Sequence, residues 1–309
     1  MDKTCENTFF KGKNDWVDAT NTAVLYPTEV KTWVLNIDSR FRDQAQSTSS
    51  TDFFIRLPRV YKNVISLKLS SVELPNTWYS FSKSNGDTTF LLDGNLVTID
   101  EGNYDPTALA AAVKAEVNGV SGFGSTDVAF DPLTGKITID NTLSGTPFTM
   151  EFGSAQNCGT TAVAGSSSFA PYSAGLGYLM GFTSQKYTGK DIYTAEYIVD
   201  TLRDNYVLLQ LPELEMMMDS FSFNSTLIRA FAKITVNVPK NELIYVDAGD
   251  MITRAISFPQ PTNVAGFRVR LVDAFGQPIN LMANFSFTLE LQEVVSTKVF
   301  EAYRNNLTC

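Results

Sequence analysis

Hydrophobic and polar residues alternate along two separated parts of this chain. The clearest run is residues 63–74, in which Val64, Leu67 and Leu69 stand among serine and lysine residues. A period of two turns every second side chain toward a core and the others toward solvent, so this run predicts a β-strand. Shorter strands are predicted at residues 33–37, 53–57, 206–211, 230–238, 267–272 and 285–291, with Pro58 ending the second of them.

The middle of the chain, residues 83–199, has a different pattern. Asp93-Gly94-Asn95 separates two apolar runs and predicts a tight hairpin. Asp105-Pro106 then begins an alanine-rich segment that predicts a helix through Val117, because Asp can cap the first turn and Pro fits within it. A second strand pair and a short helical turn are predicted after the helix, at residues 128–139 and 176–182. This order indicates a compact α+β subdomain of the ββαββ type.

These two patterns predict how the chain is divided. We expect a mainly β protein in which residues 29–82 and 200–297 form the two halves of one β-sandwich, with residues 83–199 inserted between them. Residues 1–28 are polar and show no sustained period, so we expect an N-terminal arm that becomes ordered only against a partner. Residues 298–309 are expected to form a C-terminal tail.

Composition supports a packed domain and narrows the function. Of the 309 residues, 44% are hydrophobic and 12% aromatic, which is enough for a sizeable core. The net charge is −9 and no run of basic residues occurs, which argues against direct nucleic-acid binding and against docking on anionic membranes. The chain contains no His, which excludes Ser-His-Asp and Cys-His nucleophiles and removes the commonest metal ligand. We therefore expect no enzymatic activity.

The cysteines and the apolar runs bear on the compartment. Cys5, Cys158 and Cys309 are far apart, odd in number and without metal-ligand spacing, so we expect reduced thiols. The N-terminal residues lack the apolar stretch of a signal peptide, and no apolar run is as long as a membrane span. We expect neither a signal peptide nor a transmembrane segment.

No pattern assigns a catalytic, cofactor-binding or metal-binding residue. Asp93-Gly94-Asn95 lacks the Glu at the spacing of a calcium loop, and the glycines of residues 175–181 lack the Lys-Ser/Thr of a phosphate loop. Met216-Met217-Met218 fits an adaptable contact surface or core filling equally well.

Two further groups of residues have both a functional and a structural interpretation. Arg40, Arg42 and Asp43 form either a charged network or a solvated loop. The other group comprises aromatic residues that suit a glycan or receptor surface and suit a core equally well: Trp78, Tyr79 and Tyr104.

An ordered series of short motifs resembles a known family. Residues 33–43 read WVLNIDSRFRD, residues 50–53 read STDF, residues 62–67 read KNVISL, and residues 72–79 read VELPNTWY. This series is similar to minor capsid and penton proteins of nucleocytoplasmic large DNA viruses. Shorter pieces that also fit the family lie at residues 102–104, 130–138, 179–182 and 284–290.

The resemblance implies a single jelly roll that serves as a building block of a large icosahedral capsid. It implies contacts with the major capsid protein and other minor capsid proteins, and a homo-oligomer that is a pentamer if the protein is the penton. It places the protein in the virion, assembled in the host-cell cytoplasm, and carries over no catalytic residue. We expect contacts through the arm, the loop from Asp38 to Ser50 and the tail after Thr297. A receptor- or carbohydrate-binding β-sandwich of the virion surface is the alternative, and a hydrolase on a β scaffold is a third possibility.

Overall fold

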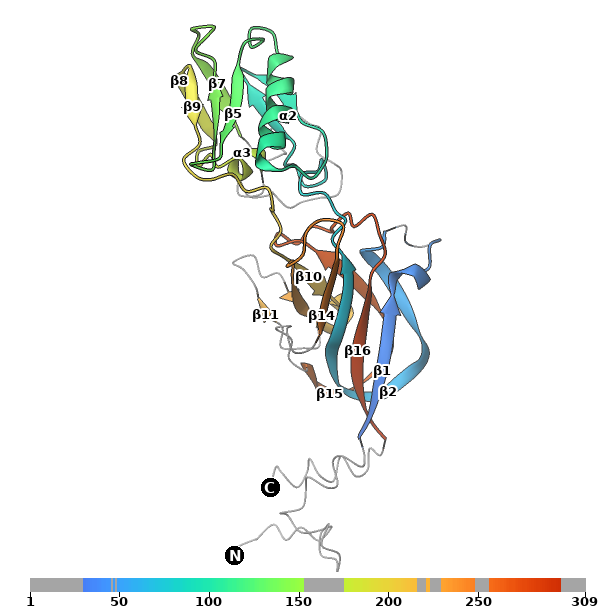
Figure 1. Ribbon diagram of the computed structural model, residues 1–309. Helices are drawn as coiled ribbons and strands as arrows, with labels where there is room; N and C mark the ends of the chain where they lie inside the picture. Colours follow the sequence, from blue (N-terminus) through green and yellow to red (C-terminus); the bar gives the residue numbers. More distant parts are fainter. Residues whose placement is uncertain are drawn as a thin grey trace, which may run out of the picture. The chain divides into compact units, whose positions relative to one another are not determined.

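The computed structural model describes residues 30–45, 47, 49–152, 175–215, 221–222, 229–247 and 256–295. The chain divides into two compact units (Figure 1). Unit 1 is Met1–Asn76 with Tyr206–Cys309, and unit 2 is Thr77–Asn205. The predicted arm, the predicted tail, the three cysteines and Met216-Met217-Met218 lie outside the described residues.

One layer of unit 1 is a four-stranded antiparallel sheet. Strand β1 (Val30–Asp38) pairs in register with β16 (Ser286–Val294), from Val30 opposite Val294 to Asp38 opposite Ser286. Strand β16 then pairs with the second half of the long strand β2 (Asp52–Pro75). Strand β14 (Leu243–Asp247) pairs with β2 on its other side.

The second layer is built from the first half of β2 and three other strands. Residues 52–56 of β2 pair with β15 (Ile256–Val272), which pairs in turn with β10 (Tyr206–Gln210). Strand β10 pairs with β13 (Ala232–Thr235). Strands β2 and β15 are long enough to run through both layers, which therefore form one continuous curled sheet. The short helix α4 (Pro212–Glu215) and the small hairpin of β11 (Phe221–Ser222) and β12 (Arg229–Ala230) lie in the connection from β10 to β13.

The pairing order is that of a jelly roll. The first strand pairs with the last, the first half of β2 with β15, the second half of β2 with β14, and β10 with β13. Such a doubly wound antiparallel ribbon of eight strand segments defines the jelly-roll sandwich. The prediction of a mainly β jelly roll is therefore confirmed. The predicted alternation is confirmed as well, because Val64, Leu67, Leu69, Val72 and Leu74 are all completely buried.

Three strand predictions are wrong in detail. Pro58 does not end a strand, since β2 continues through it. The ladder between β2 and β15 shifts register between Arg56 and Tyr61, and a proline is tolerated where ladder hydrogen bonds are interrupted. The strand predicted at residues 230–238 is split, with β13 ending at Thr235. Strand β14 was not predicted at all.

Unit 2 contains two small antiparallel sheets and a helix. One sheet has the order β4 (Asn95–Thr98), β3 (Thr89–Leu92), β7 (Phe148–Glu151) and β8 (Lys186–Lys190). The other has the order β5 (Asp127–Asp131), β6 (Lys136–Asp140) and β9 (Ile192–Thr194). The hairpin at Asp93-Gly94 has positive φ at both residues, +46° and +79°, as a tight primed turn requires.

Helix α2 (Pro106–Asn118) forms where it was predicted. The side chain of Asp105 accepts a hydrogen bond of 2.8 Å from the backbone N–H of Ala108, which satisfies one of the free donors of the first turn. Leu109, Val113 and Val117 recur at helical spacing and are fully buried against the core of unit 2. The short helix α3 (Leu176–Leu179) contributes Leu176 and Leu179 to the same core.

Candidate assembly surfaces

The loop between β1 and β2 is held by its own polar side chains. A 3₁₀ turn at Ser39–Phe41 follows Asp38, whose carboxylate accepts hydrogen bonds from the backbone N–H and the guanidinium of Arg40. The hydrogen bond from the Arg40 side chain is the main reason why the pKa of Asp38 is lowered. This turn leaves Phe41 78% exposed.

The same loop is fastened to the start of β16. The backbone N–H of Ser39 donates to the carbonyl of Phe285 at 2.9 Å, and the N–H of Phe285 donates back to the Ser39 hydroxyl at 2.9 Å. The Arg42 guanidinium donates to the Ser39 carbonyl at 2.7 Å and to Oδ1 of Asn284 at 2.8 Å. The loop is thus a pinned structure that presents one aromatic ring to solvent.

Arg40, Arg42 and Asp43 each make a different contact within the described part of this loop. Arg40 pairs with Asp38, and Arg42 binds neutral oxygen atoms. The Asp43 carboxylate accepts the backbone N–H of Ala45 at 3.1 Å. These contacts shape the loop.

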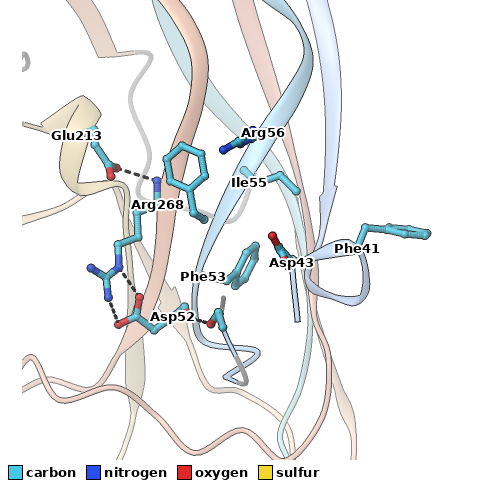
Figure 2. A pocket seen from close by; sticks show the side chains of 10 residues that line it. Phe41, Asp43, Asp52, Phe53, Ile55, Arg56, Glu213 and Arg268 are labelled. Carbon is cyan, nitrogen blue, oxygen red and sulfur yellow. Dashed lines mark hydrogen bonds and ion pairs between the residues drawn. The ribbon is translucent and has the colours of Figure 1, made fainter. Parts of the chain in front are cut away.

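A groove of about 620 Å³ lies in unit 1 beside this loop. Figure 2 shows the side chains that line it. Arg268 of β15 donates two hydrogen bonds to the Asp52 carboxylate of β2, from Nε at 2.5 Å and from Nη2 at 2.8 Å. The backbone N–H of Arg268 donates to the Glu213 carboxylate of α4 at 2.7 Å. The full lining is Phe41, Asp43, Ser47, Asp52, Phe53, Phe54, Ile55, Arg56, Glu213 and Arg268.

The chemistry of this groove suits packing and ion pairing. Asp52 and Glu213 already accept bonds from Arg268, and the hydroxyl of Ser47 donates to the backbone carbonyl of Asp52. No hydroxyl of the lining is therefore paired with a general base, as nucleophilic catalysis requires. Phe41 and Phe54 are 78% and 43% exposed, so the groove offers exposed aromatic area beside the ion pair of Asp52 and Arg268.

A second polar cluster lies at the opposite end of β1, around Trp33. The indole N–H of Trp33 donates to the Glu293 carboxylate at 2.6 Å, and Lys31 and Arg59 both lie over the Trp33 ring, at 3.9 and 4.1 Å from its centre. Burial favours a higher pKa for Glu293, but the hydrogen bonds from Trp33, the Lys62 N–H and Arg59 outweigh it, and the pKa is lowered. The cluster fixes the end of the sandwich next to the predicted arm and tail.

Unit 2 contains a buried charged cluster that we call the buried triad: Asp87, Arg203 and Asp204. Nε of Arg203 lies 2.8 Å from Oδ2 of Asp87, and its terminal nitrogen lies 2.9 Å from Oδ2 of Asp204. All three side chains are at most 3% exposed. Burial raises the pKa of Asp87 to about 7, against the opposing attraction of Arg203.

The buried triad connects the two ends of the unit 2 sequence. The Trp78 indole N–H donates to Asp204 at 3.3 Å, and the Ser82 N–H donates to Asp87 at 2.6 Å. Trp78 is only 2% exposed, and Tyr104 is half-buried with its hydroxyl donating to the Asp100 carbonyl. Tyr79, by contrast, is 38% exposed, so of the three aromatic residues only Trp78 is buried.

The glycines at residues 175–181 serve packing. A Cβ at Gly177 would lie 2.2 Å from the ring of Phe152, so only glycine allows α3 to pack at this distance. Gly181 has φ +93°, and a Cβ there would lie 2.3 Å from the carbonyl of Tyr197. These contacts explain the glycines without a phosphate ligand.

The acidic character of the chain resides in unit 2. Residues 77–205 contain 14 of the 33 Asp and Glu residues and 6 of the 24 Lys and Arg residues, giving this unit a net charge of −8. The rest of the chain is close to neutral. Within the described ranges, no three His, Cys, Asp or Glu side chains gather as a metal site. No helix in the described part of the chain is long and apolar enough to cross a membrane.

Comparisons with known proteins give structural likenesses only. Searches with family models and among curated proteins find no match to this chain. The solved structures that resemble it include the mavirus penton protein and the Sputnik virophage. The first is 10% identical, with a TM-score of 0.43, over 85% of this chain and 99% of the other. The second is 14% identical, with a TM-score of 0.37, over 86% of this chain and 99% of the other. The fold assignment rests on the strand pairing of unit 1 and not on these likenesses.

Proposed function

We propose that this protein is a structural component of a large icosahedral virus capsid, either a penton or another minor capsid protein, and that it has no enzymatic role. The observation that carries the proposal is the jelly-roll pairing of unit 1. Capsid proteins are one of the main classes built on this architecture, together with lectins and cupins. The fold alone does not distinguish a capsid protein from a lectin or a cupin, so the evidence must come from individual side chains.

The motifs that resemble the capsid family act as structural fasteners here. Asp38 fixes the turn through Arg40, and Ser39 and Arg42 hold the loop between β1 and β2 against the residues just before β16. Asn76, at the end of β2, donates its side-chain amide to the carbonyls of Val238 and Pro239 at 2.9 and 3.2 Å, which fixes the start of the β14 region. A sequence series that stabilises a scaffold fits a building block better than it fits an enzyme.

The proposed partners are the major capsid protein, other minor capsid proteins and further copies of this chain. The groove beside Phe41 offers exposed aromatic area for such contacts. A stable interface buries roughly 1,600 Å² in total, so several surfaces of this kind are needed for each subunit. Closed cyclic symmetry would repeat one contact around a ring, with five copies at each vertex for a penton. We place the protein in the virion, assembled in the host-cell cytoplasm.

Receptor or glycan binding has less support. The aromatic residues that would form a binding platform include Trp78, which is only 2% exposed. The net charge of −8 on this unit is typical of a solvated surface and favours no particular sugar.

The proposal is tested by the protein content of purified particles. Particles are washed in high salt and fractionated by density, and each protein is quantified by mass spectrometry. We expect this chain to remain at a fixed ratio to the major capsid protein, with five copies per vertex if it is the penton. Its presence in infected-cell lysate alone, with none in washed particles, would overturn the proposal.

A further inference from the structure

Strand β14 is an edge strand with an apolar outer face. Within the described ranges it pairs only with β2. Its inward side chains, Ile244 and Val246, are 0% and 6% exposed, whereas Leu243 and Tyr245 on the other face are 54% and 59% exposed. Open edges are usually protected by lysine, proline or a bulge, and residues 243–246 contain none of these.

The hydrogen bonds next to β14 determine which of its backbone groups face β2. The N–H of Asn76 donates to the carbonyl of Glu242, and antiparallel ladders alternate bonded and non-bonded pairs. Ile244 and Val246 therefore bond to β2. Leu243 lies opposite Pro75, which has no N–H. The N–H and C=O groups of Leu243 and Tyr245 thus point away from β2, toward the open edge.

The N-terminal arm contains one segment suited to this edge. Residues 22–26 read Thr-Ala-Val-Leu-Tyr, an uncharged run of strand-favouring residues that ends at Pro27. The rest of the arm before it is interrupted by charged residues and glycine.

This segment cannot reach β14 of its own copy. The distance can be traced across the sheet through paired residues. Asp247 of β14 lies opposite Ser71 of β2, which lies opposite Thr288 of β16. Thr288 lies opposite Asn36 of β1, and Asn36 is six residues along the strand from Val30. At about 3.3 Å per residue and three strand spacings of about 4.8 Å, the near end of β14 is roughly 24 Å from Val30. Four residues from Tyr26 to Val30 span at most about 14 Å.

We propose that residues 22–26 of a second copy add to β14 as an extra strand, with their backbone paired to Leu243 and Tyr245. This is strand addition at a sheet edge, in which the backbone supplies affinity and alternate side chains supply specificity. The exchange rests on the proposed function, because it requires neighbouring copies in permanent contact. It gives the arm its partner and links the subunits in a head-to-tail order that closes into a ring.

The test uses fluorescein-labelled peptides of residues 20–28 and the full-length chain, followed by fluorescence anisotropy. We expect saturable binding, and dispersal of any oligomer by excess peptide. Two further peptides carry N-methyl groups at alternate positions, one set at even and the other at odd residues. One of them should bind and the other should lose at least tenfold in affinity, because only every second N–H of an added strand faces β14. Equal affinity of the two N-methylated peptides would overturn the proposal. So would a failure of the unmodified peptide to bind.

Substitutions in the protein provide the second arm of the test. Tyr245→Pro removes an N–H that points away from β2, so the sheet should keep its melting temperature within a few degrees while the peptide loses at least tenfold in affinity. If Tyr245→Pro does not fold, Tyr245→Lys serves instead. The matched control is Val34→Lys, which places the same charge at a 68% exposed valine on the edge strand β1 and should leave binding unchanged. Loss of binding in Val34→Lys as well would contradict a β14 site. These readouts need no particles, so they can fail while the protein is still found in the capsid.

Discussion

Arg203 is the residue whose removal should damage unit 2 most. It is the single cation of the buried triad and lies between two carboxylates, with only 3% of its side chain exposed. Arg203→Met keeps much of the volume and leaves the backbone requirement unchanged, since both residues must adopt the φ of +58°. The substitution therefore isolates the loss of the charge.

The magnitude follows from the burial of the partners. Asp87 and Asp204 are 0% and 2% exposed, so neither carboxylate can be rehydrated once Arg203 is gone. Removing one partner of a buried ion pair costs about 3–5 kcal/mol, because the partners left behind lose its attraction without gaining water. The control is Lys114→Met. Lys114 and Asp127 pair at 2.8 Å but are 46% and 56% exposed, and such surface pairs contribute about 0–1 kcal/mol.

Trp78 provides the assay. Its indole donates to Asp204, so its fluorescence reports the unfolding of unit 2. In a chain carrying Trp16→Phe and Trp33→Phe, Trp78 is the only remaining tryptophan. Urea titration of this chain, with and without each substitution, gives the change in the free energy of unfolding of unit 2. An Arg203→Met cost no larger than that of Lys114→Met would refute a dry, charge-dependent cluster.

Three further predictions concern the two units. The pKa of Asp87, about 7, lies above its value in the unfolded chain, so the folded state holds the proton more tightly. Unit 2 should therefore lose about 2 kcal/mol of stability as the pH rises from about 5.5 to 8. Asp87→Asn should flatten this dependence in the Trp78 assay. Gly177→Ala should destabilise unit 2 by about 1–3 kcal/mol because its Cβ would overlap Phe152, whereas Gly124→Ala, with open space around it, should be nearly neutral by thermal melting. Replacing residues 77–205 by a short linker should leave a soluble β protein by circular dichroism, and complete loss of folding would indicate a single shared core.

The jelly-roll half of the fold was accessible from the sequence where alternation was long. Residues 63–74 show both faces of β2 in their spacing, and the structure buries the predicted face. Helix α2 was equally accessible, because Asp105 and Pro106 mark its start and alanine fills its length. In both cases the signal is local: neighbouring residues alone determine which face is buried.

The missed elements depend on contacts between distant segments. Strand β14 has five residues, too few to distinguish a strand from a loop without its partner β2. Pro58 predicts a strand end from the sequence alone, because the register shift that tolerates it arises only from pairing with β15. In the buried triad Asp87 contacts Arg203, although most of the unit 2 sequence separates the two residues. No local pattern in the sequence predicts such a contact. The sequence signal for β14 is limited to the apolar run of residues 243–246, Leu-Ile-Tyr-Val.

Density of the intact particle tests the central proposal most directly. Unit 1 should fit a subunit-sized jelly roll in the shell, either in five copies around each vertex or beneath the major capsomers. Side-chain density should show the loop at Asp38–Arg42 fastened to Asn284 as described here. A complete particle map in which every jelly roll is accounted for by other chains, with no density matching this sequence, would contradict the account.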